Sequence, residues 1–505
     1  MRRDPAALVD GVWDVVVVGG GIYGACLAWE AVLRGLTVCL LEQRDFASGA
    51  SANTMKIIHG GLRSLQHLDG RRMRDAMRER RALLRIAPHL VRPLPVLVPT
   101  YGVGLRGRGI LRAALLLNDL LGLDRNRGLD AEHRIPRGRT ISREECVRRA
   151  PVLEVARLSG AGIFHDAQVY SSERLVLAFL RSAAKAGAEI ANDVEVVDVL
   201  KHGHCVAGVR AVDRLDGDVL TIRGRAVVNA AGAGADLVLR RAGLPGLGLP
   251  LARAMNVVTR RSLAPCAFGV PTPTTYRDRR GRVHRGSRML FVVPWRDRSL
   301  VGTWYALHNA GDEATITEAD VADLLREVDA ALPALDVSLD DVAFVHAGLV
   351  PLSSSELGRG GLPLATAGRI VDHARDGCPG LVTVSGVKYT MARHMAERVV
   401  DRLLERLGRP PAPSTSAVVP LDGADGGRGS TAVDRHAWPA RAGVDDAELR
   451  RLVRTYGSAC GEVLAHADPT DMRFAVARAE TRHAIRAEMA HTLGDVVFRR
   501  TEIGS

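Results

Sequence analysis

The chain has 505 residues, of which 47% are apolar and 25% charged, and this ordinary balance excludes disorder as its main state. Its length is enough for two or three domains around a large buried core. The formal net charge is +12, yet no basic run is interleaved with aromatic residues, so nucleic acid is not an expected partner. Seven cysteines without a C-x-x-C pair indicate reduced thiols, a cytoplasmic setting and no bound metal.

The N-terminus shows no signal peptide, because Arg2 and Arg3 are followed by Asp4 and Pro5 rather than by an apolar segment. No uninterrupted apolar run reaches the ~18 residues of a transmembrane helix. The sequence therefore predicts a cytoplasmic protein whose contact with a membrane, if it has one, is peripheral.

A strand–loop–helix–strand pattern opens the chain, with the segments at residues 14–18, 19–24, 25–33 and 37–41. Gly19 permits the tight turn out of the first strand, and Gly21 lets the backbone approach a pyrophosphate. Gly24 allows the helix to pack closely on the strand. The N-terminus of this helix offers unpaired N–H groups to phosphates. Glu42 ends the second strand, about twenty positions on, where a carboxylate holds a ribose hydroxyl. The pattern predicts a Rossmann-like dinucleotide-binding domain, and hence an α/β fold.

Further strands and helices are expected along the rest of the chain. The expected helices are at residues 71–87, 173–187, 390–407, 449–456 and 471–498. The expected strands are at residues 194–200, 205–213, 219–223, 226–232, 289–293, 300–304 and 381–384. Residues 409–430 are rich in Pro, Gly, Ser and Asp, which indicates a linker before an all-helical tail.

Residues 105–125 combine an apolar run with flanking arginines. Ile110 and Leu111 precede residues 113–117, and Arg112 and Arg125 stand nearby. This composition is typical of an interfacial membrane helix, and it fits equally a helix that covers a substrate domain. The sequence leaves both interpretations open.

The Gly-rich loop alone does not distinguish FAD from NAD. The strand at residues 226–232 ends in Asn229-Ala230-Ala231-Gly232, and a second Gly-terminated strand beside the first favours FAD. The small residues at 45–51 suit a second approach to the pyrophosphate. FAD is therefore the predicted cofactor.

Several longer stretches resemble the FAD-dependent glycerol-3-phosphate dehydrogenases, peripheral-membrane flavoenzymes of the D-amino-acid-oxidase type. These stretches span nearly the whole chain and lie at residues 45–51, 56–63, 85–90, 166–168, 294–295, 300–303, 386–390 and 495–501. The resemblance implies hydride transfer from a substrate carbon to flavin N5 while a base removes the hydroxyl proton. It also implies a quinone in the membrane as electron acceptor, and Lys388 with nearby amides at the N1–C2=O edge of the flavin.

The same resemblance implies a Rossmann-like FAD-binding domain, an antiparallel-sheet substrate domain and a C-terminal helical domain. The FAD-binding domain is expected at residues 1–100, 161–250 and 346–408, a helical insertion at 101–160, the substrate domain at 251–345, the linker at 409–430 and the helical domain at 431–505. The expected cofactor-binding residues are Gly19, Gly21, Ile22, Tyr23, Gly24, Glu42, Gln43, Ser48, Ser51, Lys56, His59, Gly60, Gly61, Val194, Ala230, Ala231, Gly232, Gly386, Val387, Lys388, Tyr389 and Thr390.

The chain departs from the family pattern where substrate is expected. Val350 stands in place of the arginine that grips a phosphate, and each charged hydrogen bond so lost is worth ~1.5–3 kcal/mol. Met255 replaces a histidine, Ser64 a tyrosine and Tyr305 an aspartate. Together these changes predict a substrate that is related to glycerol 3-phosphate or has diverged from it.

Other polar residues could hold an anion or move a proton. The expected catalytic residues are His346, His59, Arg63 and Lys388, with His346 and His59 as alternative bases. The expected substrate contacts are Arg63, Ser64, Met255, Tyr305, Val350, Arg369, Lys388 and Arg393.

Three functions follow from these residues. The first is an FAD-dependent dehydrogenase that oxidises a C–OH or C–N centre of a small molecule. The second is an oxidase of specialised metabolism that acts on an alcohol or amine and passes electrons to dioxygen, and the third is a flavin-binding protein without turnover. The expected partners are the substrate, a quinone or dioxygen, a membrane surface and a second copy of the chain in a homodimer.

Overall fold

The computed structural model describes residues 1–62, 69–102, 107–153, 158–277, 283–309, 314–354, 362–424, 445–467 and 474–504. Two of the predicted site residues, Arg63 and Ser64, lie outside the described residues, as does the end of the predicted linker.

Sheet A is the Rossmann-like sheet that the Gly-rich loop predicts. Its strands run β16–β17–β10–β1–β2–β7, which are Arg369–Asp372, Leu381–Ser385, Val219–Asn229, Val12–Val18, Val38–Leu41 and Glu189–Ala191. β8 (Val194–His202) and β9 (Cys205–Asp213) extend the sheet from β10 as antiparallel partners. β1 pairs in parallel with both β2 and β10, so the carboxyl ends of these strands meet at one edge.

Both faces of sheet A are buried, which explains why β1 is a continuous apolar run. Val15 and Val17 pack against α2 (Ile22–Leu33), α6 (Ser172–Lys185) and α9 (Ala392–Arg406). Val16 and Val18 pack on the opposite face, against α1 (Pro5–Val9) and α7 (Ala235–Arg241).

Sheet B is antiparallel except where β12 meets β4, and its strands come from several distant segments of the chain. In spatial order they are β15 (Val342–Pro351), β11 (Leu251–Thr259), β14 (Arg298–His308), β13 (Val283–Trp295), β12 (Ala267–Arg277), β4 (Val91–Tyr101), β6 (Leu158–Val169) and β3 (Ile57–Ile58), with β5 (Arg139–Ile141) beside β6. β3, β4 and the main part of β6 join this sheet although they lie in segments that the sequence assigns to the FAD-binding domain, so the predicted domain segments do not each correspond to one sheet.

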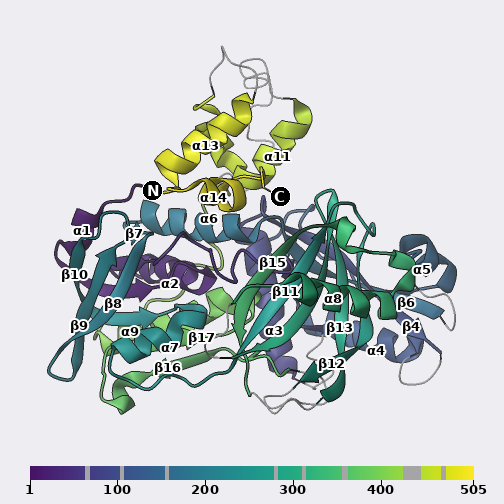
Figure 1. Ribbon diagram of the computed structural model, residues 1–505, viewed down its shortest axis with the longest axis horizontal. Helices are drawn as coiled ribbons and strands as arrows, with labels where there is room; N and C mark the ends of the chain where they lie inside the picture. Colours follow the sequence, from purple (N-terminus) through teal and green to yellow (C-terminus); the bar gives the residue numbers. More distant parts are fainter. Residues whose placement is uncertain are drawn as a thin grey trace.

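One face of sheet B is covered by α8 (Glu318–Ala331), whose Val321, Leu324 and Val328 pack into an apolar core with Val257 and Val301. The opposite face looks toward sheet A and the segment after β2, since the position of a Cβ on Gly348 of β15 lies 2.9 Å from Cα of Ala50. The molecule therefore has two sheets with a shared junction (Figure 1).

The remaining helices are α3 (Gly70–Ile86), α4 (Arg108–Leu121), α5 (Arg143–Arg149), α11 (Asp446–Tyr456), α12 (Cys460–Leu464), α13 (Ala475–Ala487) and α14 (Leu493–Asp495). The last four belong to the C-terminal helical domain, and α11, α12 and α13 form a small apolar core of its own. Figure 1 shows this domain, in yellow, seated over α6. The predicted helix at 471–498 is shorter than expected in its described part, because it breaks between α13 and α14 and ends in a π-helical turn, η9 (Val496–Arg500).

Of the two interpretations of residues 105–125, the covering helix is confirmed by the packing of α4 on sheet B, and the membrane contact stays a prediction. The inner face of α4 packs on sheet B through Leu111 and Leu115, which contact Gly162 of β6. Its outer face is also apolar, with Leu116 61% and Leu120 63% exposed. In the described part of the chain, no helix is long and apolar enough to span a membrane.

Candidate active site

The Gly-rich loop lies where β1, β2 and β10 end together, and bare backbone is a steric requirement there. Gly19 has φ +112°, and a Cβ on it would lie 2.7 Å from the carbonyl oxygen of Ala230 in the loop after β10. A Cβ on Gly24 would lie 1.8 Å from the carbonyl oxygen of Gly19. The two strand ends and the first turn of α2 can approach this closely only with glycine at both positions.

Backbone amides of the loop are held from two sides. The Gly20 amide donates to Oε2 of Glu42 at 2.7 Å, and the Ile22 amide donates to Oγ of Ser51 at 3.0 Å. Burial raises the pKa of Glu42, and the amides of Gly20 and Arg44 offset only part of that effect. The N-cap residue Gly21 has no side chain to cap α2, so that, apart from the Ile22 amide bound by Ser51, the positive end of the helix dipole is left for an anion.

The other predicted cofactor residues near this loop gather around it. The amide of Val194 donates to the Glu42 carbonyl at 2.8 Å, which places the start of β8 beside the end of β2. Gln43 is exposed and Ser48 half-buried in the segment that follows β2. A glycine cradle, an uncapped helix and a carboxylate at the strand end fit the pyrophosphate and ribose of FAD.

Lys56 is buried and its ammonium is engaged within the protein. Its Nζ donates to the Ala52 carbonyl at 2.8 Å, to Oγ of Ser172 at 2.9 Å and to Glu173 at 2.7 Å. Burial lowers the pKa of Lys56, and Glu173 opposes that shift. In this structure the Lys56 side chain ties the loop before β3 to the N-terminus of α6, and its contact with FAD stays a prediction.

His59 belongs to a hydrogen-bonded group at the end of β3. Its Nδ1 lies 3.0 Å from Oδ2 of Asp166, while Oδ1 of Asp166 accepts from the Gly60 amide at 2.6 Å and from Arg80 at 3.1 Å. Burial would raise the pKa of Asp166, but the bonds from His59, Arg80 and Gly60 bring it below its ordinary value. Asp166 is thus ionised and accepts the Nδ1 proton, and in the neutral imidazole of His59 the lone pair is then on Nε2. The His59 side chain is 55% exposed.

The loop that follows β17 meets both of the preceding loops. The Tyr23 hydroxyl donates to the carbonyl of Lys388 at 3.3 Å, and a Cβ on Gly386 would lie 2.5 Å from that hydroxyl. Oγ1 of Thr390 accepts from the His59 amide at 3.2 Å. The segment from Gly386 to Thr390 therefore joins the Gly-rich loop to the His59 loop, and Lys388 is half-buried at the start of η7 (Tyr389–Met391).

Met255 is not on the face of sheet B that looks toward this junction, so its prediction as a substrate contact is wrong. It is completely buried with Trp304 in the core under α8. Its neighbour Asn256 points to the opposite face by ordinary strand alternation, and its Oδ1 accepts from Oγ1 of Thr303, the extra residue of a β-bulge on β14, at 2.7 Å. Sequence reasoning missed Asn256 and Thr303, because the sequence does not show which face of β11 is turned toward the site.

Two predicted substrate contacts do lie on the junction face, which is the face of sheet B opposite α8. Tyr305 and Gly348 are cross-strand partners of the same residue, Ala254, and Val350 follows Gly348 by two positions, so all three face the same side. Val350 is half-buried, as is Tyr305. On the same face, the Phe291 ring lies 6.2 Å from the ring of His59.

The two arginines predicted to contact the substrate differ in exposure and in ion pairing. Arg369 is exposed on β16 and pairs with Ser385, next to Gly386. Arg393 is buried on α9, where it donates to Glu79 through two nitrogens and to Ser416 at 3.0 Å. The prediction that Arg393 holds a substrate anion is wrong, because its charge is already neutralised by Glu79 inside the protein.

His346 is an unfavourable base. It lies buried between the rings of Trp295 and Phe344, each 5.5 Å away. Burial, followed by the positive charge of Lys56, lowers its pKa to about 3. A neutral, weakly basic imidazole enclosed by aromatic rings suits packing, so the structure favours His59 of the two candidates.

The two-sheet fold with a dinucleotide loop at its junction defines a flavin-dependent oxidoreductase, and comparison with known proteins supports this class. Residues 14–402 match the family profile "FAD dependent oxidoreductase", and residues 414–505 match "C-terminal domain of alpha-glycerophosphate oxidase". The chain belongs to the FAD-dependent oxidoreductase family, and its cofactor is FAD.

Its similarity to individual proteins is over the full length. It is 30% identical to a glycerol-3-phosphate dehydrogenase of Synechocystis sp. over 100% of this chain and 91% of that protein. It is 32% identical to one from Mycobacterium leprae over 97% of this chain and 81% of that protein. Among solved structures, the glycerol-3-phosphate dehydrogenase of Bacillus halodurans complexed with FAD superposes with a TM-score of 0.73, at 25% identity, covering 98% and 87% of the two chains.

The acid sensitivity of the fold tests the assignment of His346. Because the folded state keeps His346 neutral, the unfolded chain binds one more proton below pH ~6.5, and stability falls as the pH drops from there toward 3. The variant His346→Phe has no imidazole to protonate on unfolding, so its stability should not fall with pH for this reason. Between about pH 7.5 and about pH 5, its free energy of unfolding relative to wild type should improve by about 2 kcal/mol in urea titrations. A difference that does not change with pH would contradict the buried neutral imidazole.

Proposed function

We propose that the protein oxidises a small molecule at a carbon that carries a hydroxyl or amino group, with His59 as the base that takes the proton from that group. The group formed by His59, Asp166 and Arg80 carries this proposal. When bound, FAD supplies the acceptor for the hydride that leaves the substrate carbon. His59 is available for the proton because its Nε2 lone pair is free on a half-exposed side chain.

Asp166 and Arg80 give His59 its orientation. Asp166 fixes the Nδ1 tautomer and stabilises the imidazolium that forms when Nε2 accepts a proton. Arg80, which also donates to the His165 carbonyl at 2.6 Å, keeps Asp166 ionised in a buried position. The arrangement is that of a base held by a carboxylate, with a guanidinium behind it.

FAD would be held mainly by the loops at the ends of β1, β2, β10 and β17. The pyrophosphate would meet the Gly19–Gly24 loop and the first turn of α2, and Glu42 would take a ribose hydroxyl by exchanging one of its amide partners. The loop of Gly386 and Lys388 would lie at the flavin end, because it contacts both Tyr23 and the His59 loop.

Two classes of substrate are compatible with the site. The relatives are glycerol-3-phosphate dehydrogenases, which favours a polyol phosphate, and Lys388 and Arg369 supply positive charge near the junction. Val350 and Phe291 on the junction face favour a second candidate, an oxidase for a less anionic alcohol or amine.

A donor test separates the two candidate substrates. Under anaerobic conditions, millimolar glycerol 3-phosphate should decrease the visible absorbance of the bound FAD if the polyol phosphate is the substrate. No decrease, in a protein whose FAD is still bleached by dithionite, would exclude glycerol 3-phosphate. Hydrogen peroxide formed in air, in preference to reduction of a soluble quinone, would then favour the oxidase.

Replacement of His59 tests the base. The variant His59→Gln should lose about 10²–10⁴-fold in kcat with the identified donor while it keeps its FAD, because general-base catalysis is worth that much. The matched control is His165→Gln, whose side chain points away from Asp166 on the same strand and should retain near-normal kcat. A His59→Gln variant with normal turnover would exclude this residue as the base.

We further propose that α4 docks on an anionic membrane surface, where a quinone acceptor would be found. Its outer face presents Leu116, Leu120 and Ile110, and Arg108 and Arg112 are exposed at its N-terminal end. An apolar face with flanking arginines suits the boundary between lipid headgroups and acyl chains.

Vesicle binding tests the membrane surface. The double variant Leu116→Ser/Leu120→Ser should bind vesicles of phosphatidylcholine and phosphatidylglycerol in equal parts at least about tenfold more weakly than wild type, because two leucines lose their lipid contact. Flotation of the vesicles through a sucrose gradient measures this. Leu215→Ser is the control, since Leu215 is 52% exposed on the turn between β9 and β10, away from α4. Equal losses in both variants would rule out a specific docking face.

A further inference from the structure

The end of the chain contacts the segment that follows β2, more than four hundred residues earlier. Arg500 in η9 is fully buried and donates to both carboxylate oxygens of Asp45, from Nη1 to Oδ2 at 2.8 Å and from Nη2 to Oδ1 at 2.5 Å. Arg499 donates to Oδ2 of the same carboxylate through Nε. Asn192 adds a longer bond to Oδ1 at 3.4 Å. Two arginines of the C-terminal domain thus share one buried acid of the N-terminal segment.

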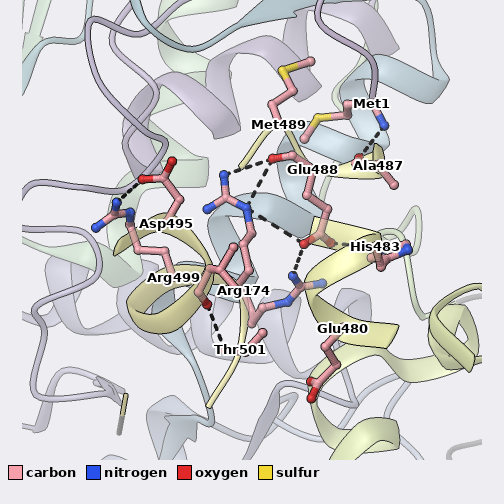
Figure 2. Close-up of polar contacts among 12 residues, drawn as sticks. Met1, Arg174, Glu480, His483, Ala487, Glu488, Met489, Asp495, Arg499 and Thr501 are labelled. Carbon is pink, nitrogen blue, oxygen red and sulfur yellow. Dashed lines mark hydrogen bonds and ion pairs between the residues drawn. The ribbon is translucent and has the colours of Figure 1, made fainter. Parts of the chain in front are cut away.

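Arg500 is itself anchored firmly in the C-terminal domain. Its Nε and Nη2 donate to the Glu488 carbonyl at 3.2 Å and 2.9 Å. The Glu488 carboxylate lies between Arg174 of α6, at 2.7 Å, and His483 of α13, at 3.5 Å (Figure 2). Arg499 also binds Asp495 of α14, as Figure 2 shows. The guanidinium groups are therefore fixed on one side by their own domain and on the other by Asp45.

Asp45 begins the segment of residues 45–52, which supports the Gly-rich loop directly. The Ala47 amide donates to the Gly20 carbonyl at 3.1 Å, and the Phe46 ring lies so close that a Cβ on Gly20 would be 2.7 Å from its Cδ1. Ser51 accepts from the Ile22 amide at 3.0 Å. The segment touches the loop at Gly20 and at Ile22, on either side of Gly21.

We propose that Arg499 and Arg500 are positioning residues for FAD, which act through Asp45 to hold residues 45–52 against the loop that cradles the pyrophosphate. This inference rests on the proposed placement of FAD at that loop. The physical reason is that a buried carboxylate without its cations must reach water or take up a proton, and either change moves the segment that carries it. FAD would then have to order the segment on binding, and its apparent affinity would fall accordingly.

A simpler role would be attachment of the C-terminal domain without any effect on FAD. The two roles differ in what they predict for the affinity of the apoprotein for FAD. Arg451 is the control for a general loss of stability in the C-terminal domain, because it donates to Glu480 at 2.9 Å and 2.7 Å within that domain and belongs to a different ion pair from Asp45.

The experiment is a fluorescence titration of the FAD-free protein with FAD, alongside thermal unfolding of the same apoproteins. Arg500→Gln should raise the Kd for FAD at least about tenfold, whereas Arg451→Gln should leave it within about threefold even though both lower the Tm of the apoprotein. Asp45→Asn should raise Kd as well, and Arg500→Gln should add little to it in the double variant, because both changes act on one contact. If Arg500→Gln does not fold, Arg499→Gln replaces it, with an expected rise of about fivefold, above the limit set for Arg451→Gln.

An unchanged Kd in Arg500→Gln, or equal increases in Arg500→Gln and Arg451→Gln, would overturn the positioning role. So would an unchanged Kd in Arg499→Gln where that variant is used. Failure of the underlying placement gives a different result. Gly24→Ala, which puts a Cβ 1.8 Å from the Gly19 carbonyl oxygen, would then bind FAD as tightly as wild type.

Discussion

The close approach of bare backbone at the end of β1 is the constraint on which the rest of the structure depends. Gly24 can sit against the Gly19 carbonyl, and Gly19 against Ala230, only because neither glycine has a side chain. That contact fixes α2 on the parallel strands and points its uncapped N-terminus across the strand ends. Three other segments of the candidate site bond to this region. Glu42 accepts from the Gly20 amide, Ser51 accepts from the Ile22 amide, and the Lys388 carbonyl accepts from the Tyr23 hydroxyl.

The parts of the fold that could be predicted from sequence are those with local signals. The Gly-rich loop, its flanking strands and the strand before Asn229 follow from short-range patterns, and the structure has them within a few residues. The components of sheet B could not be assembled in this way. Its short strand β3 and its long strands β4 and β6 are separated from β11–β15 by stretches of other structure, so that only tertiary pairing reveals them as one sheet.

The candidate site was predictable where chemistry is carried by motif and not where it depends on orientation or on a distant partner. His59 was found by its motif, but its significance comes from Asp166, which lies on β6 and bonds to it only in the folded chain. The prediction for Met255 is wrong because tertiary packing decides which face of β11 lies under α8, and that for Arg393 is wrong because its partner Glu79 is 314 positions away in the sequence. A sequence pattern identifies a charge, and only the fold shows whether that charge is already neutralised.

Buried ion pairs of this kind hold together a chain whose domains are discontinuous. Lys56 with Glu173, Arg393 with Glu79 and Arg500 with Asp45 each join segments more than a hundred residues apart. Removing one partner of a buried pair costs about 3–5 kcal/mol, although an apolar pair of the same shape is often as stable, so their value here is in selecting one arrangement of segments. Two of the three pairs hold the segment between β2 and β3, through Asp45 and Lys56. The junction face of sheet B, with Val350, Tyr305 and Asn256, bears none of these three pairs, so side chains at those positions can change without breaking them. A scaffold divided in this way can keep its flavin chemistry while its substrate changes.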